Sequence, residues 1–430
     1  MFGNMFFVVP SFCEFAYLCA IKIKLKVMIE NLNEFMSTNM AAAKRSAIRE
    51  ILKLTQRPEV ISFAGGLPAP ASFPVADIRQ CIDEVLDEAG PKALQYGTTE
   101  GDVDLRNEIV KHYARHGLNV TIDNLMITTA SQQALDIAGW IFINPGDTII
   151  CGLPSYLGAL GSFRAYGAVP VGIPFDEYGM KPDLLDAKLA EMKANGKKPK
   201  FIYLIPDFQN PTGITYPESR RQEIIDIADK YDLFIIEDCP YRELRFEGKA
   251  QRMMYELDKN NRVISLGTFS KTLAPGFRLG WVLAHPDVIY KFVTAKQHTD
   301  LCTPAILQMA TARYMSKGLF EKNFGKTIEM YREKRDYMLK CFEQYMPEGV
   351  KWTHPEGGLF LLLSLPEGYD TNELFQVAIK NNVAFVTGDV FFCDGGGKNT
   401  MRLNFSYSSL EQIEEGVKRL ASAIKEFMKK

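Results

Sequence analysis

The chain has 430 residues, of which 47% are hydrophobic and 24% charged, and its formal net charge is −2. This composition is typical of an ordinary globular protein that is large enough for more than one domain. Basic and acidic residues are mixed along the chain, which excludes a protein that binds nucleic acid through a basic patch. The eight cysteines include no CxxC pair and no metal-ligand spacing, so we expect a reducing, cytoplasmic location and no metal site.

The first 36 residues differ from the rest of the chain. Apolar residues dominate this segment, but Pro10, Glu14 and three alternating lysines interrupt them. A signal peptide carries positive charge before its apolar run, and a membrane span needs ~20 clean apolar residues. We therefore interpret residues 1–36 as an atypical extension produced from an upstream start codon. A weak membrane anchor is the alternative, and we do not expect the protein to span a membrane.

The next segments indicate helices joined by an extended crossing. Apolar spacing predicts a helix at 37–55 and two more at 75–89 and 102–116. Between the first two, the pair Gly65 and Gly66 lets the backbone approach a ligand closely. A simple surface loop would have the same composition.

From residue 124 onward, short apolar strands alternate with helices, which predicts a mostly parallel sheet covered on both faces. The strand at 125–129 leads into Ser131 and Gln132, where a helix N-terminus can bind an anion, although Ser131 could simply cap its helix. The strand at 148–151 leads to Tyr156. Its ring could stack on a flat ligand, or it could be an ordinary core or rim tyrosine.

Polar side chains also follow the next two strands. The strand at 200–205 precedes an Asn-Pro-Thr-Gly turn that begins at Asn210, and the strand at 233–236 precedes Asp238 and Tyr241. The carboxyl ends of parallel strands are where such sheets place their sites. Taken alone, an asparagine or aspartate at these positions would be an ordinary turn residue.

The most informative run is the apolar segment 264–267 with the residues that follow it. Thr268, Ser270 and Lys271 come next, and Arg278 lies just beyond a Pro-Gly break. Desolvation among apolar residues lowers the pKa of a lysine, which makes its neutral amine available as a nucleophile or base. The two hydroxyls and the arginine would suit a phosphate. An amine beside a phosphate site is what a pyridoxal phosphate (PLP) enzyme needs.

Near the C-terminus, Arg402 lies in an otherwise apolar strand at 400–406. A buried arginine needs an anionic partner. Its planar guanidinium matches the carboxylate of an amino acid. An arginine reaching out from an edge strand is the alternative.

The order of these motifs resembles the fold-type I PLP enzymes, the aspartate aminotransferase superfamily, and within it the 2-aminoadipate and kynurenine aminotransferases. The resemblance runs from about residue 37 to the C-terminus. It implies an α/β fold: a large domain with a mostly parallel sheet of the seven-stranded type flanked by helices, plus a smaller α+β domain built from the N- and C-terminal segments. We expect an N-terminal arm and helix at 37–75, the large PLP-binding domain at 76–318, and a connecting helix with the small domain at 319–430.

The resemblance also implies a role for each motif. Lys271 would hold PLP as a Schiff base and move the substrate proton, Asp238 would pair with the ring nitrogen, and Tyr156 would stack on the ring and assist catalysis. Asn210 and Tyr241 would bind the phenolic oxygen. Tyr96 would reach the cofactor of the partner subunit in a homodimer, unless it packs on its own domain. The phosphate would be bound by Ser131, Gln132, Thr268, Ser270 and Arg278, together with that Tyr96.

For the substrate, the resemblance implies that Arg402 binds the α-carboxylate, with Asn210 and Gly66 lining the pocket. Arg49 would meet a side-chain carboxylate, unless it forms a surface ion pair. We therefore expect an aminotransferase that moves the amino group of 2-aminoadipate, glutamate, aromatic or branched-chain L-amino acids to a 2-oxo acid such as 2-oxoglutarate, with ping-pong kinetics. A C–S β-lyase or decarboxylase on the same fold is the alternative. A PLP-binding transcription regulator is disfavoured, since the residues before Ser37 are too few for a DNA-binding domain.

Overall fold

The computed structural model describes residues 32–42 and 57–429. The chain divides into two compact units, Met1–Lys44 and Arg45–Lys430. Among the helices of these described residues, none combines the length and apolar character needed to cross a bilayer. Most of the N-terminal extension, Arg49 and most of the predicted helix around it lie outside the described residues. The described part of the first unit contains the 3-10 helix η1 (Leu32–Phe35) and α2 (Thr38–Ala42).

The second unit is built on an eight-stranded sheet with the order β2-β9-β8-β7-β6-β3-β4-β5. Neighbouring strands from β8 to β4 are parallel, whereas β9 is antiparallel to both β8 and β2, and the two-residue β5 is antiparallel to β4. Apart from β5, this is the predicted mostly parallel sheet. The strands are β2 (Leu125–Thr128), β3 (Thr148–Leu153), β4 (Val169–Asp176), β5 (Gly179–Met180), β6 (Phe201–Leu204), β7 (Phe234–Asp238), β8 (Val263–Thr268) and β9 (Gly280–Leu283).

Helices cover both faces of this sheet, and the alternation of side chains along each strand explains why. On β7, Ile235 packs in the cluster formed with α8 and α9, whereas Ile236 packs in the cluster formed with α6 and α7. Because successive side chains point to opposite faces, a strand with apolar residues on both faces needs helices packed on both faces of the sheet. The covering helices are α6 (Ala130–Phe142), α7 (Leu157–Ala165), α8 (Pro182–Ala194), α9 (Glu218–Lys230), α10 (Met254–Leu257) and α11 (Pro286–Thr299).

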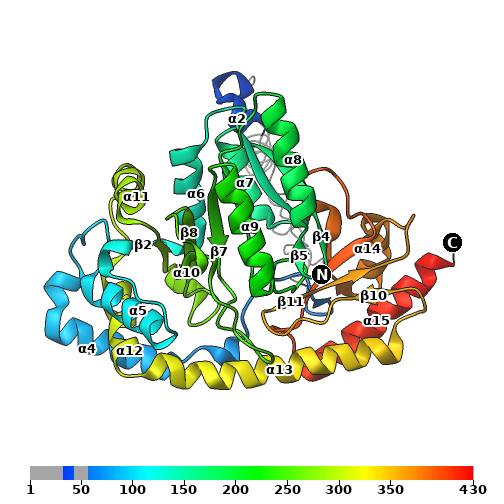
Figure 1. The fold of residues 1–430 in the computed structure, drawn as a ribbon. Coiled ribbons are helices and arrows are strands. Elements are labelled where there is room, and N and C mark those ends of the chain that lie inside the picture. The colour runs from blue at the N-terminus through cyan, green and yellow to red at the C-terminus, as the bar shows by residue number, and fades with distance from the viewer. Residues whose placement is uncertain (1–31, 43–56, 430) are drawn as a thin grey trace, which may run out of the picture. The chain divides into compact units, whose positions relative to one another are not determined.

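A group of three helices, α4 (Val75–Ala93), α5 (Val103–Arg115) and α12 (Ala305–Ser316), packs together within the second unit, as Figure 1 shows. α5 begins where predicted because the Asp102 carboxylate accepts hydrogen bonds from the backbone N–H groups of Asp104 and Leu105. α4 extends past its predicted end, since the chain resumes a helical course after a break at Ala89.

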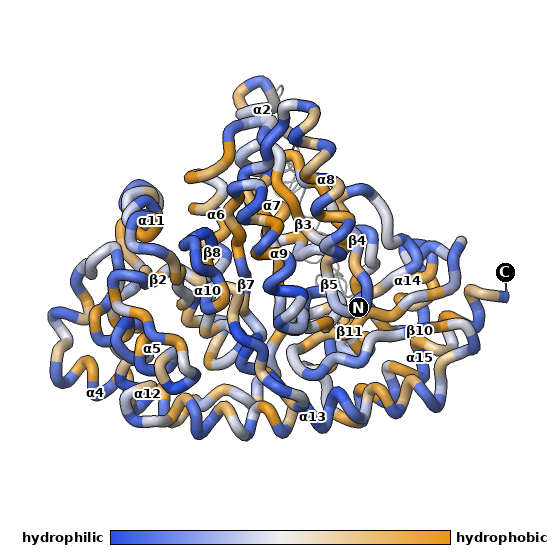
Figure 2. Tube along the Cα trace, viewed as in Figure 1, coloured by the Kyte–Doolittle hydropathy of each residue, from blue (hydrophilic) through white to orange (hydrophobic). Residues whose placement is uncertain are grey.

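The long helix α13 (Leu319–Tyr345) connects this group to a second sheet. Hydrophobic and hydrophilic residues alternate along it, as Figure 2 shows, and Tyr331, Met338 and Phe342 are buried in the cluster shared with α15. The second sheet is antiparallel, with the order β10-β11-β14-β13. Its strands are β10 (Lys351–Trp352), β11 (Phe360–Ser364), β13 (Val386–Thr387) and β14 (Thr400–Asn404). The same part of the chain contains the helices α14 (Thr371–Lys380) and α15 (Leu410–Met428).

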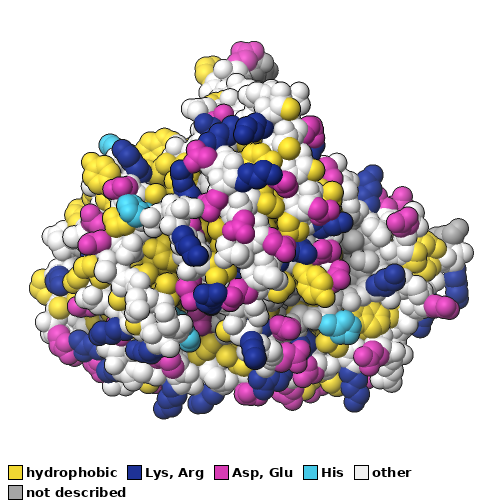
Figure 3. Space-filling model, in the orientation of Figure 1, with side chains coloured by type: hydrophobic (Ala, Val, Ile, Leu, Met, Phe, Trp, Pro, Cys, Tyr) yellow, Lys and Arg dark blue, Asp and Glu magenta, His cyan; other side chains and the backbone are white. Residues whose placement is uncertain are grey.

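A strand from the N-terminal part joins the C-terminal part. β1 (Ile61–Ser62) pairs in parallel with β12 (Val383–Ala384). This pairing agrees with a small domain made from both ends of the chain, while the residue boundaries of the domains stay a prediction. On the face drawn in Figure 3, basic and acidic side chains are interspersed, in line with the mixed charge of the sequence.

Candidate active site

The carboxyl ends of β6, β7 and β8 open onto a cleft of about 660 Å³. This volume lies within the ~300–1,000 Å³ range of ligand pockets. Twelve of the predicted site residues line the cleft. They lie at or after the strand ends of the large sheet, on β14 of the second sheet and in the segment after β1: Gly66, Ser131, Gln132, Tyr156, Asn210, Asp238, Tyr241, Thr268, Ser270, Lys271, Arg278 and Arg402.

Lys271 follows β8, and its amine is buried inside the cleft. Nζ donates a hydrogen bond to the carbonyl oxygen of Gly66 at 2.7 Å. Burial lowers the pKa of Lys271 to about 8, and the positive charges of Arg402 and Arg278 act in the same direction. The amine therefore loses its proton far more readily than a surface lysine, which suits a nucleophile and base.

Asp238 ends β7 with its carboxylate fully enclosed. The Tyr203 hydroxyl donates to Oδ2 at 2.9 Å, whereas Oδ1 is buried and has no partner among the described residues. Burial raises the pKa of Asp238 to about 7, and the Tyr203 hydrogen bond opposes that rise. A buried carboxylate oxygen without a donor is costly, so this atom is suited to accept a hydrogen bond from a ligand N–H group.

Tyr203 was missed by sequence reasoning, although strand alternation contains the necessary information. In the parallel pairing of β6 with β7, Tyr203 lies beside Ile236, and Asp238 is two residues further along the same face. Glu237 points to the opposite face, as alternation predicts. There its carboxylate accepts hydrogen bonds from the backbone N–H groups of Met254 at 2.7 Å and Tyr255 at 3.2 Å.

One end of the cleft is suited to bind a phosphate. Ser131 is the second residue of α6, in the first turn, where the backbone N–H groups have no hydrogen-bond partner within the helix. The hydroxyls of Thr268 and Ser270 lie 3.0 Å apart, and Arg278 Nη1 lies 3.5 Å from the Ser270 hydroxyl. Only glycine fits at position 280, because a side-chain carbon there would stand 2.7 Å from the Ser131 nitrogen.

Arg402 lies on β14 and enters the cleft from the second sheet. Nη1 donates to Asn210 Oδ1 at 3.0 Å and Nη2 donates to the Ala64 carbonyl at 2.7 Å, but Nε has no hydrogen-bond partner among the described residues. The guanidinium forms no ion pair with a carboxylate in the described part of the chain. Burial lowers the pKa of Arg402 to about 10, so the group stays charged at neutral pH. A buried cation in this state is suited to bind an anion.

Aromatic rings enclose this arginine. The guanidinium carbon lies 4.2 Å from the ring centre of Phe360 and 5.3 Å from that of Phe391. Phe360 also contacts the Tyr241 ring edge to face. Sequence reasoning found neither phenylalanine, because each looks like an ordinary core residue until the two sheets are brought together.

The remaining predicted residues differ in their placement. The Asn210 amide lies 3.5 Å from the Tyr241 hydroxyl, and the Tyr156 hydroxyl lies 3.5 Å from Gln132 Oε1. Tyr96, in contrast, lies outside the cleft with 78% of its surface exposed. Its predicted reach into a partner subunit stays a prediction.

The chemistry of the cleft fits PLP. A buried amine, an unpartnered carboxylate oxygen, a tyrosine ring at the wall and an anion site at one end match the aldehyde, pyridine nitrogen, ring face and phosphate of that cofactor. The residues therefore agree with the group that the sequence motifs imply.

Comparison with known proteins places the chain in a family. The sequence pattern of aminotransferase class I and II matches residues 58–420. Aromatic-amino-acid aminotransferase 1 of Thermococcus litoralis is 47% identical over 411 residues, covering 95% of this chain and 99% of that protein. The 2-aminoadipate transaminase of Thermus thermophilus is 40% identical over 383 residues, covering 88% and 94%. The crystal structure of a Pyrococcus horikoshii kynurenine aminotransferase in complex with PMP has a TM-score of 0.89 and 46% identity, covering 93% and 99%.

The chain belongs to aminotransferase class I and II. It is a transaminase that uses pyridoxal phosphate, and it has the predicted α/β fold of the fold-type I PLP enzymes. The resemblance found in the sequence is thus confirmed, and the relatives do not favour a lyase, decarboxylase or regulator.

Proposed function

We propose that this transaminase takes the amino group of L-amino acids with aromatic or other large apolar side chains, as well as 2-aminoadipate and glutamate, and transfers it to a different 2-oxo acid, which is 2-oxoglutarate for every donor other than glutamate. The observation that carries this proposal is the buried Arg402 guanidinium, which faces the cleft without a carboxylate partner in the described chain. An α-carboxylate placed there would bring Cα toward the Lys271 amine.

The walls of the cleft support the aromatic and apolar donors. Leu67, Leu157 and Phe360 line it, and Leu67 is 44% exposed. Lys271, Arg278 and Arg402 are the lysines and arginines among its described lining residues, and each already has a proposed role. We propose that Arg49, which lies outside the described residues, meets the side-chain carboxylate of a dicarboxylic donor.

The proposed roles of the residues follow from their positions. When bound, PLP supplies an aldehyde carbon and a ring that accepts electrons from the substrate. Neutral Lys271 Nζ takes the proton from the substrate Cα and later returns it. Asp238 Oδ1 accepts a hydrogen bond from the ring N–H and keeps that proton in place. Arg402 fixes the carboxylate so that the Cα proton points at Nζ.

The experiment is a panel of amino donors with 2-oxoglutarate, followed by the formation of glutamate. Phenylalanine, tyrosine, leucine, 2-aminoadipate and aspartate are the donors. Parallel lines in double-reciprocal plots are expected, together with a higher kcat/KM for the aromatic donors than for aspartate. Release of pyruvate or CO₂ in place of glutamate, or a preference for aspartate, would contradict the proposal.

We also infer a homodimer in the cytoplasm. The large exposed fraction of Tyr96, on the loop between α4 and α5, supports a contact with a second copy. The six described cysteines are free, which suits a reducing compartment. Sedimentation of the holoenzyme measures the mass, and a monomer at all concentrations would contradict this inference.

A further inference from the structure

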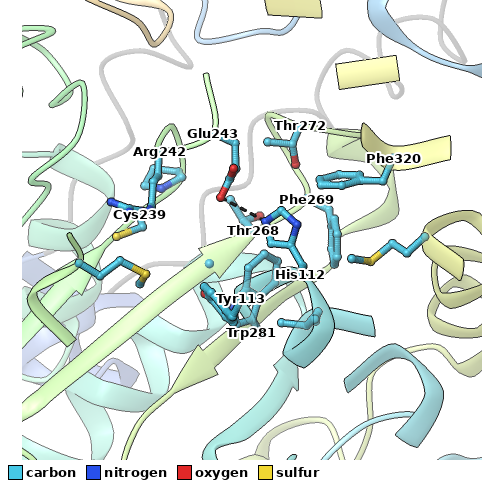
Figure 4. Close-up of a pocket in the computed structure, with 15 residues that line it drawn as sticks. His112, Tyr113, Cys239, Arg242, Glu243, Thr268, Phe269, Thr272, Trp281 and Phe320 are labelled. Carbon is cyan, nitrogen blue, oxygen red and sulfur yellow. Dashed lines mark hydrogen bonds and ion pairs between the residues drawn. The ribbon is translucent and has the colours of Figure 1, made fainter. Parts of the chain in front are cut away.

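A second, smaller cavity lies beside the active site, and Figure 4 shows the side chains that line it. Its volume is about 20 Å³, and Thr268 belongs to the walls of both this cavity and the active-site cleft. His112 and Glu243 both line this cavity, and the dashed line in Figure 4 marks the contact between their side chains. His116, one helical turn further along at the end of α5, is their neighbour.

These three residues are arranged like the ligands of a metal ion. His112 Nε2 lies 3.3 Å from Glu243 Oε1, and one ligand atom from each of the three residues lies within 4.8 Å of the others. Two ligands of a tetrahedral zinc ion, each bonded at ~2.0–2.1 Å, stand roughly 3.3 Å apart. The His116 ring packs edge to face on that of His112, with 4.8 Å between their centres, and it is the exposed member of the group.

The surroundings of His112 support the same interpretation. The residue is 7% exposed, its Nδ1 has no hydrogen-bond partner in the part of the chain that the structure describes, and Glu321 Oε1 lies 3.9 Å from that atom. Histidine ligands commonly donate their second N–H to a carboxylate, which fixes the tautomer that presents Nε2 to the metal.

The neighbouring positive charges are already paired. Arg115 forms an ion pair with Glu321, and Arg242 Nη1 lies 3.1 Å from Asp207 Oδ2. Among the described residues Glu243 pairs with His112, and a cation between these two side chains would take the place of that contact. Two imidazoles and one carboxylate form a ligand set that zinc accepts readily.

We propose that His112, His116 and Glu243 bind one divalent transition-metal ion, with zinc the best match, and that water fills the fourth position. The ion ties the end of α5 to the segment that follows Asp238 and Tyr241. The proposed site differs from the expectation of no metal, because cysteine spacing carries no information about the His-x-x-x-His pair formed by His112 and His116.

The test uses the PLP-loaded enzyme after treatment with a chelator. Titration with ZnCl₂ at pH 7.5 is expected to give one ion per chain, and CoCl₂ is expected to give the visible bands of tetrahedral cobalt. His116→Ala is expected to weaken zinc binding at least tenfold. The matched control is His298→Ala, which removes another exposed helical histidine and should leave binding unchanged.

Two results would overturn the proposal: no stoichiometric zinc binding by the wild-type enzyme, or equal affinity in the wild type and His116→Ala. If His112→Ala does not fold, His116→Ala and Glu243→Gln still decide the matter. These variants leave every residue of the active-site cleft in place, so transaminase turnover without added metal checks that the protein is intact.

Discussion

Two buried arginines near the Asn-Pro-Thr-Gly turn, Arg221 and Arg402, have opposite surroundings. Arg221 has no exposed surface, and its guanidinium donates to both oxygens of Asp207, at 2.7 and 3.2 Å, and to backbone carbonyls. Arg402 is equally buried but has no carboxylate partner in the described chain, and its Nε is unpaired. Removing one partner of a buried ion pair destabilises a fold strongly, whereas a buried cation without a counter-ion is suited to bind an anionic ligand. Substitutions in the two regions should therefore separate stability from activity.

The largest effect is expected from Lys271→Ala in the cleft. Losing both the nucleophile and the base should reduce turnover by at least about 10⁴-fold. The absorbance of the lysine-bound cofactor should disappear, while the thermal midpoint of the cofactor-free protein falls little. Steady-state glutamate formation and the visible spectrum measure the two effects, and substantial residual turnover would refute the role of this lysine.

Arg221→Met tests the paired region. It leaves Asp207 buried with fewer partners, and we expect a loss of about 3 kcal/mol in the free energy of unfolding. Arg252→Met is the control, because Arg252 pairs with Glu218 on the surface, where solvent screens the ion pair, and its loss should change stability far less. Urea denaturation measures both variants, and equal losses would contradict the contrast drawn here.

Arg402→Lys tests the unpaired region. A point charge replaces the planar fork, so kcat/KM for every donor should fall by about 10- to 100-fold. Stability should change little, because Arg402 makes no ion pair in the described chain. The donor panel at fixed 2-oxoglutarate gives the first quantity and thermal unfolding the second. A variant that loses stability but keeps its activity would make Arg402 structural.

The smallest effect is expected from Tyr203→Phe, which removes one hydrogen bond from Asp238. Burial raises the folded pKa of Asp238 from 3.8 to about 7, so the folded state holds this proton more tightly than the unfolded state. The stability of the cofactor-free protein therefore falls as pH rises through that interval. Without the Tyr203 donor the pKa of Asp238 rises further, so the decrease in the free energy of unfolding should continue to higher pH.

The cofactor should also bind about tenfold more weakly to Tyr203→Phe, because the carboxylate is no longer fixed. Tyr314→Phe is the matched control, since the Tyr314 hydroxyl is likewise buried but has no partner among the described residues. An unchanged pH profile and cofactor affinity in Tyr203→Phe would exclude a positioning role.

The sequence was sufficient for residues whose chemistry is local. Lys271, Asp238 and Asn210 each follow an apolar strand, so their placement at the sheet edge follows from strand order. It was insufficient for contacts between distant segments. Tyr203 meets Asp238 only through the pairing of β6 with β7, and Phe360 meets Arg402 only through β11 and β14.

The same limit applies to smaller features of the fold. The short strand β5 and the continuation of α4 to Ala93 depend on tertiary packing more than on local pattern. Glu243 lies far from α5 in the sequence, so its contact with His112 could not be read from the His-x-x-x-His pair alone.

Arg402 lies on β14, and α15 is the element that follows β14 in the described part of the chain. β14 is also an interior strand of its sheet, between β11 and β13. During synthesis on the ribosome, the segments that bear Asp238 and Lys271 therefore emerge before Arg402, the residue that we propose for the substrate carboxylate. A nascent chain that stops before β14 would contain the proposed cofactor residues but would lack this arginine.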